Sequence, residues 1–374
     1  MDRRHVLIDD YLSGMFSKKE LAERAGVSRP TIDLWIARFE ALGREGLADR
    51  SSAPHNSPRR TAADVEQLIL ATRRKHPSWG AKKLRQYLEL HRSQLELPAR
   101  STINDILDRH GELRKQVARR SDAPRGRTAG GTATAANERW CLDFKGQFLL
   151  GNHRYCYPLT VSDEHSRYLL LCHALSSTEG APVRRQLERL FAEHGLPERI
   201  RSDNGSPFAG IGLWGLSRLN VWWTTLGIIH QPSRRGCPQD NGRHERMHRT
   251  LKAEATRPPE QTMPRQQRRF DGFRHEYNDE RPHEALDGLP PARLWQPSPR
   301  ALPATIPGPE YPGHYEVRRV GGNGTIKFKN EVRFLSGALD GNDLGLEEID
   351  DGIWSIWLYH RLLGRLELRS GIIR

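Results

Sequence analysis

Cysteine is scarce in this chain, long apolar runs are absent, and acidic residues are outnumbered by basic ones. The four cysteines form no Cys-x-x-Cys pair, which argues against a disulfide framework or a structural zinc site. No stretch of about 18 consecutive apolar residues occurs, so the sequence predicts no membrane-spanning helix. The N-terminus also lacks the apolar segment of a secretion signal. We therefore expect an intracellular, cytoplasmic chain.

The excess of basic residues indicates a polyanionic partner. Lys and Arg number 59 against 46 Asp and Glu, which gives a formal net charge of +13, and the pI is near 9.9. Roughly nine of the excess positive charges fall within the first 128 residues, whereas the chain beyond residue 312 is about neutral. Charge gathered at one end is typical of nucleic-acid binding by that end. The alternative is a basic protein that has no such partner.

Residues 1–48 carry the pattern of a helix-turn-helix unit. Ser17 and Glu20 form a capping box that opens a helix, and Gly26 supplies the turn after it. A second helix follows Ser28 and has one apolar face, formed by Ile32, Trp35, Ile36 and Phe39. This pattern favours DNA binding, with the second helix in the major groove, over a plain helical hairpin. The candidate DNA contacts of this unit are Arg29, Thr31 and Arg38.

A second helix-turn-helix unit is expected over residues 61–111. Thr61 opens a helix, the sequence 76–80 interrupts it, and Gly111 ends a third helix. The candidate DNA contacts here are Lys82, Lys83 and Arg100. Residues 112–137 predict a basic flexible linker, and residues 49–60 predict a polar linker. The latter carries three further candidate DNA contacts, Arg50, Arg59 and Arg60.

Residues 138–295 change to an alternating pattern and predict an α/β domain. Three successive strands are expected near 140–144, 155–161 and 168–171, followed by an amphipathic helix that stops at Gly195. The pattern continues with a strand at 200–202, a helix at 213–226, a strand at 228–231 and a helix at 240–255. Antiparallel strands followed by alternating helices and strands are in the order of the RNase H-like fold.

The chain ends in a β-rich region. Residues 296–312 are rich in proline and predict a linker. Residues 313–374 contain short alternating stretches separated by Gly and Asn-Asp turns, which predict a small β-barrel. The expected fold class is therefore multidomain, with all-α helix-turn-helix units at the N-terminus, an α/β RNase H-like catalytic core, and a small all-β barrel at the C-terminus.

Three acidic residues of the core are candidate catalytic residues. Asp143 lies in an otherwise apolar strand, where a carboxylate is costly unless it is paired or bound to a metal. Asp203 ends the strand 200–202, and Glu245 lies on the last helix. Phosphodiester transfer needs its attacking and leaving oxygens stabilised, which two metal ions about 3.5–4 Å apart achieve with carboxylate ligands. We expect the three acids to hold two Mg²⁺ or Mn²⁺ ions.

The helix that carries Glu245 also supplies candidate DNA contacts. Met247 and Leu251 are expected to point inward, and the outward candidates are His248, Arg249 and Lys252. Other interpretations of the acids stay open. Asp143 alone is compatible with a buried ion pair to an arginine, and Glu245 with a surface pair to Arg249 at the i,i+4 spacing. Two more acids, Asp163 and Asp240, are better interpreted as turn formers than as metal ligands.

Several motifs resemble those of the integrase-core transposases of bacterial insertion sequences, which are relatives of the retroviral integrases. The matching sequences are Trp-Cys-Leu-Asp-Phe at 140–144, Val-Ser-Asp-Glu-His-Ser-Arg-Tyr at 161–168, Arg-Ser-Asp-Asn-Gly-Ser-Pro-Phe at 201–208, Gln-Asp-Asn-Gly-Arg-His-Glu-Arg-Met-His-Arg-Thr-Leu-Lys at 239–252, and Tyr-Asn-Asp-Glu-Arg-Pro-His-Glu-Ala-Leu at 277–286. The resemblance covers roughly 138–295 and implies Asp143, Asp203 and Glu245 as an acidic triad. The chain departs from the family in a longer spacing between Asp203 and Glu245, which extra sequence around 210–220 explains.

The resemblance implies a transposase that binds the ends of a mobile DNA element and catalyses metal-dependent strand cleavage and strand transfer. Its partners would be double-stranded DNA, as element ends and target, and further copies of the chain in a homo-oligomer on DNA, with no membrane. It would then be associated with the nucleoid. The alternative is a sequence-specific DNA-binding regulator with an inactive core. A hydrolase of RNA–DNA hybrids is disfavoured, because helix-turn-helix units suit duplex DNA better than an A-form hybrid.

Overall fold

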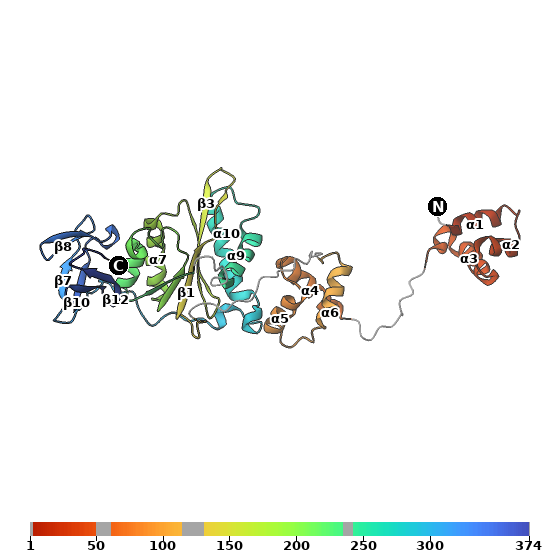
Figure 1. Cartoon of the computed structure of the whole chain (residues 1–374). Coiled ribbons are helices and arrows are strands. Elements are labelled where there is room, and N and C mark those ends of the chain that lie inside the picture. Colours follow the sequence, from red (N-terminus) through yellow and green to blue (C-terminus); the bar gives the residue numbers. More distant parts are fainter. Residues whose placement is uncertain (1–2, 50–60, 114–130, 235–241, 374) are drawn as a thin grey trace. The chain divides into compact units, whose positions relative to one another are not determined.

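The computed structural model describes four stretches of the chain, residues 3–49, 61–113, 131–234 and 242–373. They divide into two compact units, one ending at Ala62 and the other beginning at Ala63 (Figure 1). Four residues with predicted roles lie outside the described stretches: Arg50, Arg59, Arg60 and Asp240. Within the described stretches, no helix combines the length and the apolar character needed to cross a membrane.

The first unit is a helical bundle with the predicted helix-turn-helix connection. It contains α1 (Arg3–Leu12), α2 (Lys18–Ala25), α3 (Arg29–Leu42) and the short η1 (Gly43–Leu47). The predicted capping box is present, since the Ser17 hydroxyl accepts from the Glu20 amide and the Glu20 carboxylate accepts from the Ser17 amide. Gly26 ends α2 at a φ of 65°, in the left-handed region where glycine carries no steric penalty. The apolar side chains of Leu21, Ile32 and Ile36 meet in the core.

The second unit begins with three further helices, α4 (Ala63–Lys75), α5 (Ala81–His91) and α6 (Arg100–Arg109). Their shared core contains Ile69, Trp79, Leu84 and Ile103, all fully or almost fully buried. Gly111 follows α6 at a φ of 69°, as the sequence predicts for the residue beyond a helix end. These helices form the group that the sequence assigns to a second helix-turn-helix.

A mixed sheet follows the helices. Its strands are β1 (Arg139–Phe144), β2 (Phe148–Leu149), β3 (Tyr155–Asp163), β4 (Leu169–Leu175), β5 (Arg199–Ser202) and β6 (Ile229–Pro232). β3 pairs antiparallel with β1, β2 and β4, whereas β5 pairs parallel with both β1 and β6. The sequence predicts the three antiparallel strands and the two later strands, but neither the parallel pairing of the later strands nor the two-residue strand β2.

Helices cover both faces of this sheet. One face carries α7 (Gly180–His194) and α8 (Arg218–Thr225), and the other carries α9 (Gly242–Ala255) and α10 (Met263–His275), which continues into the π-helical η4 (Glu276–Glu280). Side chains alternate along a strand. On β1, Trp140 and Leu142 therefore enter the α7–α8 core, while Asp143 faces α9. The face of β1 that carries Asp143 thus lies toward the helix that carries Glu245.

The helix predicted around 213–226 is in fact two shorter elements. The short η2 (Leu213–Gly215) contains Trp214 at a φ of 61°, and α8 starts only after Ser217, whose side chain forms a capping box with Asn220. This segment belongs to the extra sequence between Asp203 and Glu245. Leu216 and Val221 in it pack against the C-terminal strands, so the extra residues connect the core to the C-terminal domain.

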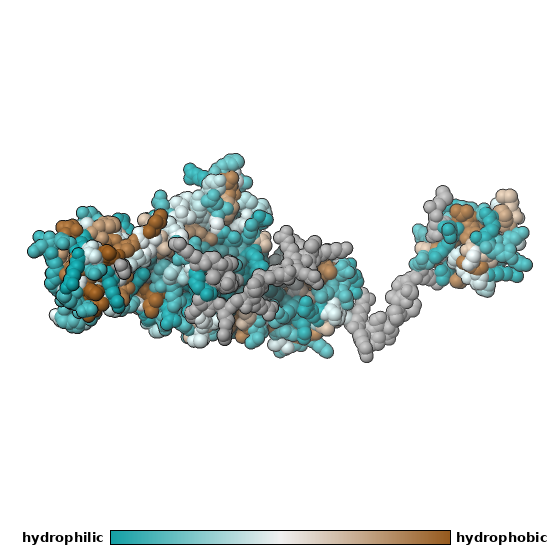
Figure 2. All heavy atoms as spheres, in the orientation of Figure 1, coloured by the Kyte–Doolittle hydropathy of each residue, from teal (hydrophilic) through white to brown (hydrophobic). Residues whose placement is uncertain are grey.

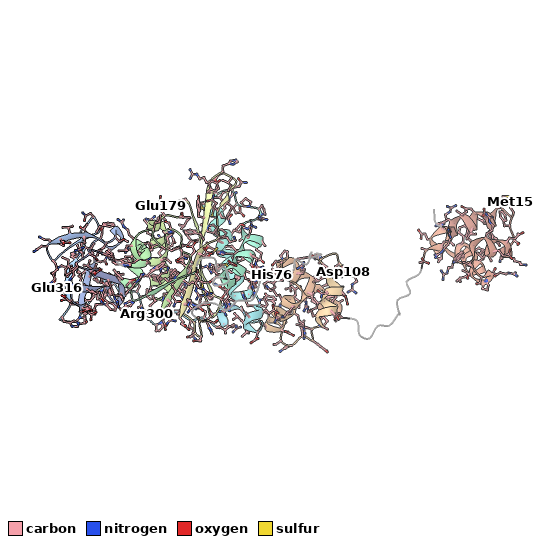
Figure 3. All side chains as sticks on the ribbon, in the orientation of Figure 1. Met15, His76, Asp108, Glu179, Arg300 and Glu316 are labelled. Carbon is pink, nitrogen blue, oxygen red and sulfur yellow. The ribbon has the colours of Figure 1, made fainter. Side chains whose placement is uncertain are left out.

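Residues 296–306 lie against the core. The Ser298 amide donates to the His194 carbonyl at 2.8 Å, and the Arg300 guanidinium donates to the carbonyls of Pro197 and Gly227 at 2.7 and 3.0 Å. Figure 3 labels Arg300 at this place. The side chains of Leu302 and Ile306 pack on the α7–α8 core. The proline-rich sequence is therefore attached to the domain that precedes it.

Ionic contacts also join α4 and α5 to the segment that follows α10. The ammonium of Lys75 lies 2.7 Å from Glu280, and that of Lys82 lies 2.5 Å from Glu284, the first residue of the short η5 (Glu284–Leu286). The buried imidazole of His76, labelled in Figure 3, lies between two carboxylates: its Nδ1 is 3.1 Å from Glu276 and its Nε2 is 3.4 Å from Glu280. The second helical group is thus held on the core.

The C-terminal domain is an open β-structure. Its elements are β7 (Glu316–Arg319), β8 (Thr325–Phe328), β9 (Glu331–Phe334), η7 (Gly337–Leu339), β10 (Asp343–Asp350), β11 (Ile353–Leu358) and β12 (Arg361–Glu367), and η6 (Pro291–Arg293) precedes them. The order β12-β11-β10-β7 makes one sheet, and β8 and β9 pair only with each other. The prediction of a barrel is therefore wrong, because the β8–β9 hairpin leaves the sheet after β7 and closes no ring among the described strands.

The two sheets of this domain share one apolar core. Phe328 of the hairpin contacts Trp354 of the larger sheet with ring centroids 4.9 Å apart. Hydrophobic side chains also remain on the surface of this domain (Figure 2). Val332 and Phe334 of β9 are 70% and 65% exposed.

Candidate catalytic site

The parallel pairing of β1 with β5 brings two of the predicted acids to the same level. Cys141 is in register with Arg201, so Asp143 and Asp203, each two residues further along, lie at the same ends of neighbouring strands. Asp203 follows β5 directly and is exposed, and its carboxylate accepts a hydrogen bond from the Gly205 amide at 3.2 Å. Glu245 lies exposed in the first turn of α9, the helix that crosses this face.

The electrostatics of Asp143 show that the three acids share one region. Its side chain is only 21% exposed, and burial raises its pKa from 3.8 to about 7. The negative charges of Asp203 and Glu245 act in the same direction, because a like charge disfavours ionisation. Cations would relieve this repulsion. The structure therefore brings together all three acids that the sequence singles out.

Behind Asp143 lies a chain of hydrogen bonds between β3 and α9. The Thr160 hydroxyl is 2.8 Å from Nε2 of His244 and 2.7 Å from Nε2 of His248. The Ser162 hydroxyl is 2.7 Å from Nδ1 of His244. Burial depresses the pKa of both imidazoles, to about 3 for His244. Both rings thus favour the neutral form.

His248 is not the outward DNA contact that the sequence suggests. It is 6% exposed and points toward the sheet, with Nδ1 at 3.8 Å from Oδ2 of Asp143. Met247 and Leu251 are buried, as predicted. The inward face of α9 therefore contains polar side chains as well as apolar ones.

Cationic side chains also lie near Asp143 and on α9. Arg249 and Lys252 are exposed on α9, where a DNA contact is predicted for each. Lys145, which the sequence reasoning missed, follows β1; burial and the positive charge of Lys252 lower its pKa, and the negative charge of Asp143 opposes this. Because Lys145 lies only two residues after Asp143 in the sequence, it could have been included among the candidate site residues. The acids and these amines form a region suited to a phosphate backbone.

The neighbouring acids have structural roles. One Asp163 oxygen accepts the Asn137 amide at 2.8 Å, and the other accepts the amide and hydroxyl of Ser166 at 2.7 Å, as expected of a turn former. Glu164, which sequence reasoning left without a role, is 4% exposed and pairs with Arg139 at 2.7 Å, and with two further arginines, Arg201 and Arg243, at 3.5 and 3.4 Å. This buried cluster fixes the start of β1 beside the site.

The predicted DNA contacts of the helical groups differ in accessibility. Arg29 and Arg100 are exposed at the starts of α3 and α6, and Thr31 and Arg38 are half-buried on α3. Lys82 is exposed although it pairs with Glu284. Lys83 is less accessible: burial lowers its pKa to about 8, and the charge of Arg281 acts in the same direction.

Two stretches of the chain match the integrase core domain, residues 133–238 and residues 226–291. The chain therefore contains an integrase core domain over residues 133–291. The resemblance inferred from the motifs is therefore confirmed, and the two stretches of the integrase core contain all three acids. Two further matches lie in front of the integrase core: a helix-turn-helix domain over 3–55 and a homeodomain-like domain over 31–107.

Insertion-element proteins are among the relatives of this integrase-core chain. The IS476 uncharacterized 39.2 kDa protein of Xanthomonas euvesicatoria is 26% identical over 280 residues, which are 74% of this chain and 76% of the relative. The IS407 uncharacterized 31.7 kDa protein of Burkholderia multivorans is 28% identical over 164 residues, 43% of this chain and 56% of the relative.

Solved retroviral structures are similar only distantly. The HTLV-2 integrase catalytic core domain in complex with magnesium has a TM-score of 0.35 at 13% identity, over 43% of this chain and 97% of that one. A chain of the simian T-cell lymphotropic virus intasome in complex with the PP2A regulatory subunit B56 gamma has a TM-score of 0.39 at 15% identity, over 80% of this chain and 97% of that one.

Proposed function

We propose that this chain is a transposase that binds the ends of a mobile DNA element and catalyses metal-dependent strand cleavage and strand transfer. The observation that carries the proposal is the parallel register of β1 and β5, which puts Asp143 and Asp203 at the same ends of neighbouring strands, while Asp143 faces α9, the helix that carries Glu245. Burial and the charges of Asp203 and Glu245 raise the pKa of Asp143 in this position. Three carboxylates held near one another are costly, because each charge disfavours ionisation of the others. The arrangement is the one that two hard divalent ions would stabilise.

The residues fit such ions chemically. Asp143 and Asp203 present oxygens from adjacent parallel strands, and Glu245 presents another from α9. Two Mg²⁺ or Mn²⁺ ions held there would supply Lewis-acid stabilisation of the attacking and leaving oxygens of a phosphodiester. Arg249 and Lys252 would hold the DNA backbone on either side of the reacting phosphate. Asp143 must lose its proton before it can bind a cation.

Recognition of element ends would belong to the helical groups in residues 1–120. In α3, Arg29 lies exposed at the start of the second helix of a helix-turn-helix, the position that contacts base edges in such units. Lysine and arginine contacts to phosphates make the binding salt-dependent. A fragment of residues 1–120 should bind end DNA specifically and lose affinity as salt rises. The same sequence preference in an isolated 138–295 fragment would refute this assignment.

The decisive experiment measures cleavage and joining of end DNA by the purified full chain. Activity should appear with Mg²⁺ or Mn²⁺ and vanish with a chelator. Glu245→Gln should abolish both reactions while end binding persists, and Asp240→Asn is the matched neighbouring acid that should stay active. Near-normal joining by Glu245→Gln together with loss in Asp240→Asn would move the third carboxylate to Asp240. End binding by the wild-type chain without any cleavage would instead favour a regulator with an inactive core.

Holding two DNA ends requires more than one acidic triad, so we also propose that the chain acts as a homo-oligomer on DNA. Light scattering of the full chain bound to end DNA should give a mass of at least two protomers. A strictly monomeric complex that still joins DNA would refute this part of the proposal.

A further inference from the structure

The hydrogen bonds of Thr160 fix the proton positions on two histidines. Its hydroxyl lies 2.9 Å from the main-chain carbonyl oxygen of Asp143, and within 2.8 Å of Nε2 of both His244 and His248. A hydroxyl has one hydrogen to donate, and a carbonyl oxygen can only accept. Thr160 therefore donates to the carbonyl and accepts from both imidazoles. Each Nε2 accordingly carries the proton of its ring.

The two rings then differ at their other nitrogen. Nδ1 of His244 accepts from the Ser162 hydroxyl at 2.7 Å, so both of its nitrogens are engaged by hydroxyl groups. Nδ1 of His248 instead faces Oδ2 of Asp143 at 3.8 Å, a separation too long for a hydrogen bond. In a neutral imidazole whose Nε2 carries the proton, Nδ1 has a lone pair. Two lone-pair atoms therefore face each other across the candidate site.

A metal ion fits between these two atoms. Zn²⁺, a first-row divalent ion, binds imidazole nitrogen at about 2.0–2.1 Å and carboxylate oxygen at about 2.0–2.2 Å, so one ion of this kind can touch two such donors up to about 4.3 Å apart. The 3.8 Å between Nδ1 of His248 and Oδ2 of Asp143 lies within that limit. The ring is already oriented, because its Nε2 donates to Thr160. Asp143, His244 and His248 lie close enough to suggest a metal site, but the hydroxyl partners of His244 remove that residue from the ligand set.

We propose that His248 is a direct metal ligand through Nδ1 and shares one cation with Asp143. This inference rests on the proposed function, because the cation is one of those assigned to the acidic triad. A site with a nitrogen and an oxygen donor favours Mn²⁺ or Co²⁺ over Mg²⁺ more strongly than carboxylates alone, since imidazole suits transition metals and Mg²⁺ prefers oxygen. The chain would therefore contain one cation position that discriminates between divalent metals.

The test is pulsed electron paramagnetic resonance of Mn²⁺ bound to the untagged full chain. The wild-type protein should show ¹⁴N modulation from a coordinated imidazole, which changes on ¹⁵N-histidine labelling. His248→Ala should lose the nitrogen signal, and Asp143→Asn should lose it with the shared ion. His360→Ala is the matched control, because His360 is exposed in the C-terminal domain, and it should keep the signal. Mn²⁺ affinity should fall about tenfold or more in His248→Ala, while Mg²⁺ affinity should fall less.

The outcomes separate this inference from the proposed function. Mn²⁺ bound at Asp143 without nitrogen coupling would overturn the ligand role of His248 and leave the acidic site intact. No Mn²⁺ bound by the wild-type protein would overturn both. If circular dichroism shows His248→Ala to be unfolded, the ¹⁵N-labelled wild-type protein still decides the question, and His248→Gln offers a second variant of more similar size.

Discussion

The raised pKa of Asp143 makes the stability of the metal-free protein depend on pH in an unusual direction. Burial and the neighbouring acids raise this pKa from 3.8 to about 7. Between these two pH values the folded protein keeps a proton that the unfolded chain has already released. The free energy of unfolding must therefore fall as the pH rises through this window, and the penalty is complete above about pH 7.

The size of the effect follows from the two pKa values. At 1.36 kcal/mol for each pKa unit, the ionisable carboxyl destabilises the fold by about 1.7 kcal/mol at pH 5 and by about 4 kcal/mol at pH 8. Asp143→Asn removes the charge but keeps the size of the side chain. Relative to the wild-type protein, it should gain about 2–3 kcal/mol more stability at pH 8 than at pH 5, again to order of magnitude. Effects of the substitution that do not depend on pH cancel in this difference.

Urea denaturation in the presence of a chelator, at pH 5 and pH 8, measures the difference directly. Asp271→Asn is the matched control, because Asp271 is an exposed acid on α10, outside the candidate site. Mg²⁺ at pH 8 should stabilise the wild-type protein more than Asp143→Asn, since cation binding offsets the penalty. Equal effects of Asp143→Asn at the two pH values would refute the reasoning.

Three further predictions concern the residues around the site. Glu164→Gln should lower the free energy of unfolding, measured by urea denaturation, by about 3–5 kcal/mol, because Glu164 is a buried partner of arginines. Glu188→Gln is the control: Glu188 forms an exposed pair with Arg184, so the substitution should cost about 0.5 kcal/mol or less. Trp79→Ala should lower the free energy of unfolding by about 3–5 kcal/mol, because it removes a fully buried ring that stacks on His76. Leu90→Ala is the control, because Leu90 is exposed, and an equally small effect of Trp79→Ala would contradict the packing. Lys82→Ala should change the free energy of unfolding by less than about 1 kcal/mol, because the pair of Lys82 with Glu284 is exposed. The same substitution should reduce the slope of the logarithm of the DNA-binding constant against the logarithm of the salt concentration by about 1. An unchanged slope would exclude a phosphate contact by Lys82.

The sequence predicts the core sheet well because its strands are short, alternating and consecutive. The same alternation places Asp143 on the face opposite Trp140 and Leu142. Asp203 could be predicted as a site residue because it directly follows a strand. Hydrophobic periodicity is a local property, and these assignments need little else.

The failures come from contacts between distant residues. His248 was assigned outward because only apolar residues were expected to point inward, but its partner Thr160 is 88 residues away on β3. Barrel closure likewise depends on which strands pair, and the β8–β9 hairpin pairs only with itself. The proline-rich residues 296–306 contact the core through Arg300, whose carbonyl partners lie 73 and 103 residues earlier. Local sequence patterns carry no information on these partners.

The attachment of α4 and α5 to the core has a consequence for the proposed cleavage of DNA. Lys75 and His76 join these helices to η4, which directly continues α10. If α4–α6 binds specific bases of an element end, those bases and the cleaved phosphate are held at a fixed distance from each other along the DNA. Five base pairs inserted between them would turn the cut phosphate to the far side of the double helix, since one turn takes about 10–10.5 base pairs. The distance from the bound bases, and not the DNA sequence at the cleaved phosphate, would then set the position of cleavage.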